Sequence, residues 1–276
     1  MHTIPVKPTD KAARFARVKK LSMADVPLAA RTLHASFGTD ALAKLLTVHI
    51  EDPKQRDLVD GKLYECYLKQ HIAKGLCFGI GESEDGFETV AVWSHPKSVE
   101  EGLDSFANLM EAGYGTLWEM SGKKGQEKIF KGMLPLLHDT CERILTSDKR
   151  FSAKDVYTLV YLGSEEKARG KGNVRTMFDY MFENYIDVPG NNNITYLESS
   201  SADNIPIYNR FGFEFYEDIF LGSQDKPNAR EGHDYAVMNV MIRGTNGGPW
   251  EGKSPSTADS EYELVSADGS LASTKA

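Results

Sequence analysis

Long hydrophobic runs are absent from the sequence. No stretch approaches the roughly 20 apolar residues that a membrane-spanning helix needs, and the start, MHTIPVKPTDKAARFARVKK, lacks the apolar centre of a secretory signal peptide. We therefore expect a cytoplasmic protein without a membrane partner. The three cysteines, Cys66, Cys77 and Cys141, are widely spaced and form no CxxC pair. They are expected to be buried thiols, and no metal is predicted.

An excess of positive charge is also missing, because the net charge is -8 at pH 7. A nucleic-acid surface needs Lys and Arg clustered over a whole face, so no nucleic-acid partner is expected. Any anion that this protein binds must be held by a local group of residues. The 41% hydrophobic and 10% aromatic content is sufficient for a globular core.

The two ends of the chain are poor in core-forming residues. Residues 1–11 are expected to be a flexible N-terminus. Residues 244–276 are rich in Gly, Ser, Thr and Pro, and they carry five acidic against two basic residues. Such a segment buries too little apolar surface to offset the entropy lost on ordering, so we expect a disordered acidic tail.

Between these ends the hydrophobic periodicity changes repeatedly between helical and strand spacing. Helical spacing is found at 24–37, 53–74, 126–146, 172–186 and 203–211. Strands are predicted at 16–23, 76–83, 87–94, 156–164, 194–200, 213–221 and 235–243. The order predicts a mixed α/β (α+β) sheet protein.

One segment combines a strand, a basic glycine turn and a helix. Its sequence is VYTLVYLGSEEKARGKGNVRTMFDYMFE, residues 156–183. Gly170 and Gly172 allow the backbone to approach a ligand closely, and a helix start offers free N–H groups to a phosphate oxygen. Four cations fall within nine residues: Lys167, Arg169, Lys171 and Arg175. The segment predicts a pyrophosphate site; the alternative is a surface turn with solvated charges. Neither a dinucleotide-binding nor a P-loop pattern is present.

A second segment, YLESSSADNIPIYNRFGFEFY, follows at 196–216. Together the two segments resemble the acetyl-CoA core of the Gcn5-related N-acetyltransferase (GNAT) superfamily. The residues that match its two patterns are Arg169 and Gly172 in the first, and Asn204, Tyr208, Gly212 and Phe213 in the second. Val174 departs from the small residue usual at its position. VAVWSHPKSVEEG, residues 90–102, further resembles the puromycin-type branch.

This resemblance implies the GNAT fold, a central mixed, mostly antiparallel sheet splayed between two adjacent strands and flanked by helices. It implies an acetyltransferase domain at 12–243, with helical insertions at about 40–74 and 103–150 that shape the acceptor pocket. It also implies acetyl-CoA as the cofactor. The coenzyme-binding residues would be Tyr161, Leu162, Gly163, Arg169, Gly170, Lys171, Gly172, Asn173, Val174, Arg175, Asn204 and Tyr208.

The reaction implied is direct attack of a neutral amine on the thioester. Tyr208 would protonate the leaving thiolate, and a backbone N–H between Tyr161 and Gly163 would bind the thioester carbonyl. Glu198 is the candidate base, because alternation places it among apolar neighbours that raise a carboxyl pKa. The alternatives are core packing for Tyr208, and a structural role for Glu198 with proton removal through water.

The acceptor is expected to be a small-molecule amine, in detoxification or primary metabolism. Trp93, His95 and Trp118 are candidate acceptor contacts, although large aromatic residues are more often core residues. A protein or peptide acetyltransferase and a catalytically silent CoA-binding sensor remain open as alternatives. The sequence is compatible with a monomer or a homodimer.

Overall fold

A computed structural model describes residues 8–250 of the chain. The predicted flexible N-terminus lies outside the described residues up to position 7, and the helix α1 (Pro8–Phe15) occupies its remainder. The predicted tail lies outside them from position 251. None of the helices between residues 8 and 250 is long and apolar enough to cross a membrane.

The described chain divides into two compact units that alternate along the sequence. The first unit comprises the residues up to 37 together with 61–114 and 157–191. The second unit comprises 38–60, 115–156 and the residues from 192. Each unit contains antiparallel strands and helices, which gives the mixed α/β fold that the sequence predicted.

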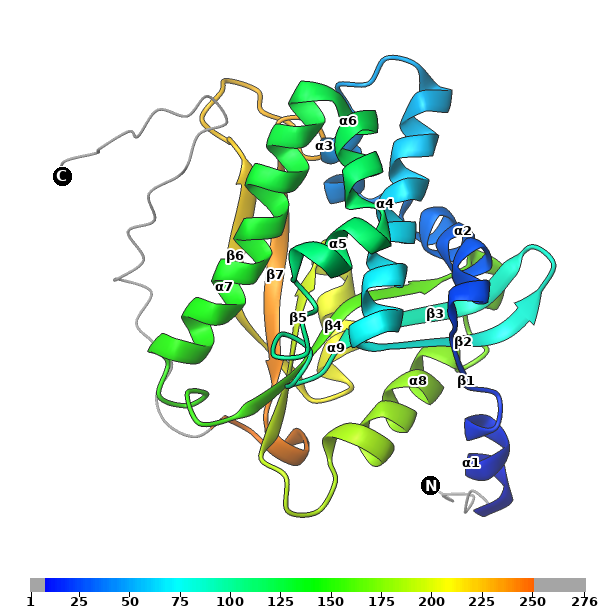
Figure 1. Ribbon diagram of the computed structural model, residues 1–276. Helices are drawn as coiled ribbons and strands as arrows, with labels where there is room; N and C mark the ends of the chain where they lie inside the picture. Colours follow the sequence, from blue (N-terminus) through cyan, green and yellow to red (C-terminus); the bar gives the residue numbers. More distant parts are fainter. Residues whose placement is uncertain (1–7, 251–276) are drawn as a thin grey trace. The chain divides into compact units, whose positions relative to one another are not determined.

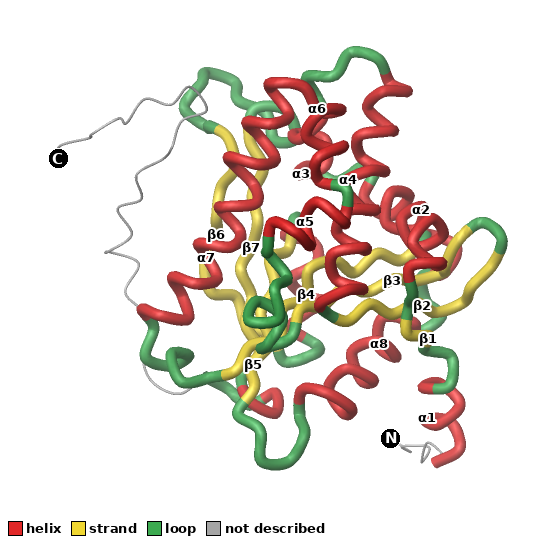
Figure 2. The backbone as a smooth tube through the Cα atoms, viewed as in Figure 1, coloured by secondary structure: helices red, strands yellow, loops and turns green. Residues whose placement is uncertain are grey.

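Four antiparallel strands form the framework of the first unit, in the order β1-β2-β3-β4. They are β1 (Lys19–Lys20), β2 (Leu76–Ser83), β3 (Gly86–Ser94) and β4 (Asp155–Ser164). Figure 2 shows β2 and β3 as a long hairpin, as the turn at Glu84–Gly86 predicted. The strand predicted at 16–23 is wrong in length, because only two exposed lysines pair there and Met23 already begins a 3-10 turn.

The helices of the first unit are α1, α2 (Val26–Phe37), most of α4 (Pro53–Lys74), α5 (Phe106–Ala112) and α8 (Asn173–Met181) with a π-helical turn at Phe182–Ile186. Helices α2, α4 and α8 follow the predicted helical spacing, whereas α1 was not predicted. Helix α1 packs along α8 (Figure 1), where Phe15 meets Tyr180 edge-on at 5.4 Å and Arg14 pairs with Asp179 at 3.0 Å. Residues 8–11 form the first part of helix α1.

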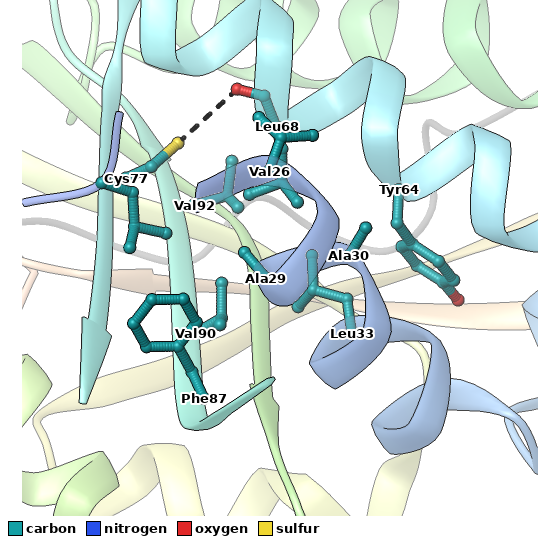
Figure 3. Close-up of a cluster of buried hydrophobic side chains, with 11 residues drawn as sticks. Val26, Ala29, Ala30, Leu33, Tyr64, Leu68, Cys77, Phe87, Val90 and Val92 are labelled. Carbon is teal, nitrogen blue, oxygen red and sulfur yellow. Dashed lines mark hydrogen bonds between the residues drawn. The ribbon is translucent and has the colours of Figure 1, made fainter. Parts of the chain in front are cut away.

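The core of the first unit forms between α2 and the β2–β3 hairpin (Figure 3). Val26, Ala29 and Leu33 recur at helical spacing and face the strand residues Val90 and Val92. All five side chains are buried, which stabilises the helix on the sheet through apolar contact.

A polar contact fixes how α2 lies on β3. The Thr32 hydroxyl donates to the Phe87 carbonyl and accepts from the Phe87 N–H, both at 2.8 Å. Strand β4 also passes close to α2 at Gly163, where an added Cβ would lie 2.9 Å from Leu33 Cδ2 and 3.0 Å from Ser36 Oγ. A side chain at position 163 would therefore displace the Leu33 and Ser36 side chains of α2.

The second unit contains three antiparallel strands in the order β5-β7-β6. They are β5 (Asn193–Ser199), β6 (Phe213–Gly222) and β7 (Tyr235–Arg243). Its helices are α3 (Ala41–Thr47), the start of α4, most of α6 (Tyr114–Lys128), α7 (Leu134–Ser147) and α9 (Ile205–Asn209). Helix α6 is broken at Gly122, which has φ 62° and ψ 175°. The helix predicted at 126–146 is the end of α6, a π-helical turn at Ile129–Met133 and α7.

The first residues of the predicted tail pack on the second unit. Trp250 Nε1 donates to the Ile242 carbonyl at 3.1 Å, and the ring meets Phe151 edge-on at 5.6 Å. Arg150 lies 5.1 Å from the Trp250 ring centroid and forms an ion pair with Asp148 at 2.7 Å. The predicted start of the tail at 244 is therefore wrong, because one large aromatic side chain is enough to dock this segment.

Candidate active site

The basic glycine turn lies in the first unit, between β4 and α8. Gly170 and Gly172 have φ of 79° and 75°, which side chains of L-residues rarely adopt, so the backbone requires glycine at both. An added Cβ at either position would meet nothing within 4 Å, so the space beside the turn is open to a ligand. Gly172 is the N-cap of α8, and its carbonyl accepts the Thr176 N–H at 2.9 Å.

The start of α8 supplies the geometry that an anionic ligand needs. The N–H groups of a first helical turn have no acceptor within their own helix, and the helix dipole is positive there. Asn173 and Val174 begin this turn; Asn173 is buried and Val174 is partly buried. Diphosphate binding by backbone N–H groups depends little on which side chain follows, which limits the consequence of Val174.

The four cations of the turn are not equivalent. Lys167 pairs with Glu165 at 2.9 Å, and Lys171 pairs with Glu88 of β3 at 2.6 Å. Arg169 is exposed and forms no ion pair within residues 8–250. Arg175 is exposed on the first turn of α8. The sequence showed the charges but not this pairing, which leaves Arg169 as a better candidate for phosphate contact than the two lysines.

The Glu88 carboxylate was missed by the sequence analysis. Its other oxygen accepts from Asn173 Nδ2 at 2.8 Å, and Asn173 Oδ1 accepts from Arg17 at 2.7 Å. A signal was present, because Glu88 is the one charged residue in the strand FETVAVWS. Identifying its partners required the spatial contact of β3 with α8, which no local pattern reveals.

The segment predicted to bind the thioester carbonyl lies in β4. Tyr161, Leu162 and Gly163 pair with Val92, Ala91 and Val90 of β3. The register shifts between Val92 and Trp93, which leaves Val160 as an extra residue of β4 just before this segment. Such a bulge increases the local twist of a strand and redirects the residues beside it.

The candidate acid, Tyr208, lies in the second unit on α9. Asn204 ends the 3-10 turn before α9, one helical turn ahead of Tyr208. The Tyr208 ring meets Phe213 edge-on at 5.9 Å. The side chain is only partly buried in area, yet desolvation raises the pKa of its hydroxyl to about 12. Tyr208 therefore holds its proton at neutral pH.

The candidate base, Glu198, lies on β5 opposite Val240 of β7. Its neighbours along the same face are Ile194 and Tyr196, and both are fully buried. Burial of its carboxyl raises the pKa of Glu198 to about 7. The predicted effect of the apolar face on this carboxyl is therefore present.

A second carboxylate, Asp40, was also missed. Asp40 Oδ1 caps α3 by accepting the N–H groups of Leu42 and Ala43 at 2.9 and 3.1 Å. Asp40 Oδ2 accepts a hydrogen bond from the Ser200 hydroxyl at 2.5 Å. This contact connects the start of α3 to Ser200, which follows the last residue of β5 and lies two residues after Glu198. Burial raises the pKa of Asp40. In sequence Asp40 resembles an ordinary N-cap, and nothing local points to Ser200.

The three candidate acceptor contacts have different environments. Trp93 is 1% exposed and packs edge-on against Phe178 of α8 at 6.0 Å, so its predicted role in the acceptor pocket is wrong: it is a core residue of the first unit. His95 is partly buried and its Nδ1 accepts the Lys97 N–H at 3.3 Å. Trp118, in the second unit, is 40% exposed beside Phe130 and is available to a ligand.

Among residues 8–250, one set of possible metal ligands comes together, on α7. Donor atoms of His138, Asp139 and Glu142 lie within 4.8 Å of one another, and all three residues are exposed. Exposed acidic groups are often this close without binding an ion.

Comparisons with known proteins place the chain in a family. No family model matches it. A crystal structure from Corynebacterium glutamicum, described as histone acetyltransferase HPA2 and related acetyltransferase, shares the fold, with a TM-score of 0.50 at 18% identity over 83% of this chain and 95% of that one. An uncharacterized N-acetyltransferase of Schizosaccharomyces pombe is 30% identical over 228 residues, 82% of each chain. The chain belongs to the GNAT family of N-acetyltransferases. A polyamine N-acetyltransferase of Drosophila melanogaster is similar at 11% identity, over 82% of this chain and 98% of that one, with a TM-score of 0.49.

Membership confirms the fold class and the acyltransferase class that the sequence predicted. Members of the GNAT family take the acetyl group from acetyl-CoA. The roles of individual residues in this GNAT protein, its acceptor and its branch within the family are matters of proposal.

Proposed function

We propose that this protein transfers the acetyl group of acetyl-CoA to an amine of a small molecule, by direct attack of the amine on the thioester. The observation that supports this most strongly is the turn at 169–175, two positive-φ glycines and a helix start within a member of the GNAT family. The turn has the form of a diphosphate site in a chain whose net charge of -8 does not favour anions elsewhere.

The residues present fit the coenzyme. Gly170 and Gly172 leave open space where any side chain would begin, and backbone N–H groups of α8 would hold the diphosphate. Arg169 and Arg175 would add charge-assisted contacts. Asn204 of the second unit would be a further coenzyme contact.

When bound, acetyl-CoA supplies a thioester, whose acetyl group is transferred without passing through the enzyme. A backbone N–H in Tyr161–Gly163 would bind the thioester carbonyl oxygen, where negative charge develops. Tyr208 would hold a proton at its hydroxyl for the leaving sulfur, and its pKa of about 12 keeps that proton in place at neutral pH. Glu198, with a pKa of about 7, would accept a proton from the acceptor's ammonium group, directly or through water, so that the neutral amine can attack the thioester.

The acceptor is proposed to be a small amine, handled by a member of the puromycin-type branch. The supporting features are the VAVW strand followed by Pro96, and the helices α3 to α7 in the two segments identified as insertions. Trp118 and His95 are the candidate acceptor contacts that the structure leaves accessible. A peptide acceptor would need an open groove for an extended chain. A silent CoA-binding sensor would not need Tyr208 and Glu198.

An acceptor panel tests this proposal. Thiol release from acetyl-CoA is measured with an arylalkylamine, an aliphatic diamine, puromycin and a short peptide with a free N-terminus. We expect turnover with at least one small amine and slower turnover with the peptide. Turnover only with the peptide would favour a peptide acetyltransferase, and coenzyme binding without turnover of any acceptor would favour the sensor.

A further inference from the structure

The Glu88 side chain reaches from β3 to the coenzyme turn at two points. One carboxylate oxygen lies 2.6 Å from Lys171 Nζ, and the other accepts from Asn173 Nδ2 at 2.8 Å. Lys171 and Asn173 flank Gly172, the N-cap of α8. A single carboxylate therefore holds both sides of the residue whose positive φ shapes the turn.

Asn173 explains why this contact matters to the turn. The residue is only 1% exposed, so its amide must find partners within the protein. Its Nδ2 donates to Glu88, and its Oδ1 accepts from Arg17, which itself lies 3.8 Å from Glu88. Without Glu88 the buried Nδ2 would lose this acceptor, and the first residue of α8 would lose its tie to β3.

The charges around Glu88 are consistent with a permanently ionised anchor. Hydrogen bonds from Lys171 and Asn173 lower the pKa of Glu88. Lys171 is half exposed, so its ammonium could have extended into solvent, yet it lies against the carboxylate. A lysine held in this way is less available to a phosphate than Arg169, which forms no ion pair in the part of the chain that the structure describes.

We propose that Glu88 is a positioning residue for the coenzyme turn, and that Lys171 anchors the turn to Glu88 instead of contacting phosphate. The inference rests on the proposed function, because it assumes that this turn binds acetyl-CoA. It changes the set of residues that bind the diphosphate, which reduces to backbone N–H groups together with Arg169 and Arg175. It also adds a carboxylate to the residues that form an anion site, although a negative charge by itself would weaken the binding of an anion.

The sign of one mutational effect tests this role. Glu88→Ala removes both contacts and also removes a negative charge near the diphosphate. If Glu88 positions the turn, acetyl-CoA binds about tenfold more weakly to the variant, in line with the loss of charged hydrogen bonds. If Glu88 only neutralises Lys171, the variant binds as tightly as the wild type or more tightly, and the proposal is overturned.

The conservative variant Glu88→Gln keeps an oxygen acceptor for Asn173. We expect its dissociation constant to stay within about threefold of the wild-type value, since a neutral acceptor retains much of the hydrogen bond. Steady-state kinetics should show the loss in Glu88→Ala mainly as a raised KM for acetyl-CoA, with a smaller fall in kcat. Glu82→Ala is the matched control, because Glu82 forms an ion pair with Lys19 and not with a residue of the turn.

Lys171 is tested in two backgrounds at about 0.15 M salt, where long-range charge effects are screened. Lys171→Met should weaken acetyl-CoA binding about fivefold in the wild type but less than twofold in Glu88→Gln, because the two residues act as a pair. A loss in Glu88→Gln equal to or larger than that in the wild type would show that Lys171 contacts phosphate, and would overturn this half of the proposal.

Hydrogen exchange gives a readout that needs no coenzyme. The backbone amides of residues 170–175 should exchange faster in Glu88→Ala than in the wild type, and Glu88→Gln should restore the slower rate. Unchanged exchange would overturn the positioning role. Failure of the wild type to bind acetyl-CoA would instead refute the proposed function, so the two failures are distinguishable.

Discussion

Replacing the proposed base should stabilise the protein at alkaline pH while it lowers activity. Glu198 carries a pKa of about 7 in the folded protein against an ordinary value of 4.5, because its carboxyl is desolvated on β5. The folded state therefore keeps a proton that the unfolded chain releases. The free energy of unfolding is fully retained below about pH 4.5, and it falls as the pH rises towards 7.

The size of this effect follows from the displacement of the pKa. One pKa unit corresponds to about 1.4 kcal/mol, so the shift of Glu198 from 4.5 to about 7 corresponds to a cost of at most about 3.5 kcal/mol for its ionised form above pH 7. Glu198→Gln has no charge to bury. We expect it to unfold at higher urea concentration than the wild type at pH 8 and at a similar concentration at pH 4.5. Its kcat should fall, and the inflection of wild-type kcat near pH 7 should disappear.

Urea unfolding at pH 4.5, 6 and 8 measures the difference directly. The matched control is Glu214→Gln on β6, since Glu214 is exposed. This control should change the pH dependence of unfolding little. If Glu198→Gln showed the same pH dependence as the wild type, Glu198 would be ionised without cost, and its assignment as a base with a raised pKa would be refuted.

Three further variants test other parts of the site and fold. Tyr208→Phe keeps the ring contact with Phe213 but loses the hydroxyl proton. We expect kcat to fall by about 10²-fold while the acetyl-CoA dissociation constant changes less than threefold. Retention of half the wild-type kcat, with chemistry rate-limiting, would exclude the acid role. Asp40→Ala removes the cap of α3 and the hydrogen bond with Ser200. It should lower the free energy of unfolding, measured by urea titration, by about 2 kcal/mol. A change below about 0.5 kcal/mol would show that these contacts stabilise the fold little. Trp250→Ala should lower the free energy of unfolding by about 2 kcal/mol, and Trp250→Phe should lower it less, because the phenyl ring keeps part of the aromatic packing. An unchanged melting temperature of Trp250→Ala would mean that this segment does not pack on the second unit.

Much of the fold could be predicted because its signals are local. Helix α4 begins at Pro53 and ends before Gly75, as the favoured first-turn proline and the apolar spacing predicted. The hairpin β2–β3 and the helix α8 follow from alternation, turn residues and a glycine N-cap in the same way. Strand β1 could not be predicted in length, because an edge strand of two lysines has no alternation.

The backbone of the glycine turn could be predicted from the sequence, but the ion pairs of its side chains could not. Gly170 and Gly172 reveal the turn because only glycine suits their φ values. Which cation pairs with which carboxylate depends on the packing of β3 on α8, so the sequence did not reveal Glu88 or its ion pair with Lys171. Trp93 was placed in the acceptor pocket because sequence spacing does not show that α8 covers it.

The tail illustrates the limit of composition. An average over residues 244–276 conceals a single tryptophan, and Trp250 packs against Phe151 and Arg150 despite its Gly- and Pro-rich surroundings. Composition describes how much surface a segment can bury in total. It does not exclude one aromatic side chain that finds a complementary partner.

Calorimetric titration of acetyl-CoA shows whether the turn at 169–175 holds the coenzyme. Wild-type protein is compared with Arg169→Glu/Arg175→Glu and with a control of equal charge change, Lys226→Glu/Arg230→Glu, at exposed positions of the second unit. We predict that the first double variant binds at least tenfold more weakly, with a smaller dependence on salt, and that the control binds like the wild type. Equal affinity of the folded Arg169→Glu/Arg175→Glu variant and the wild type would contradict the account.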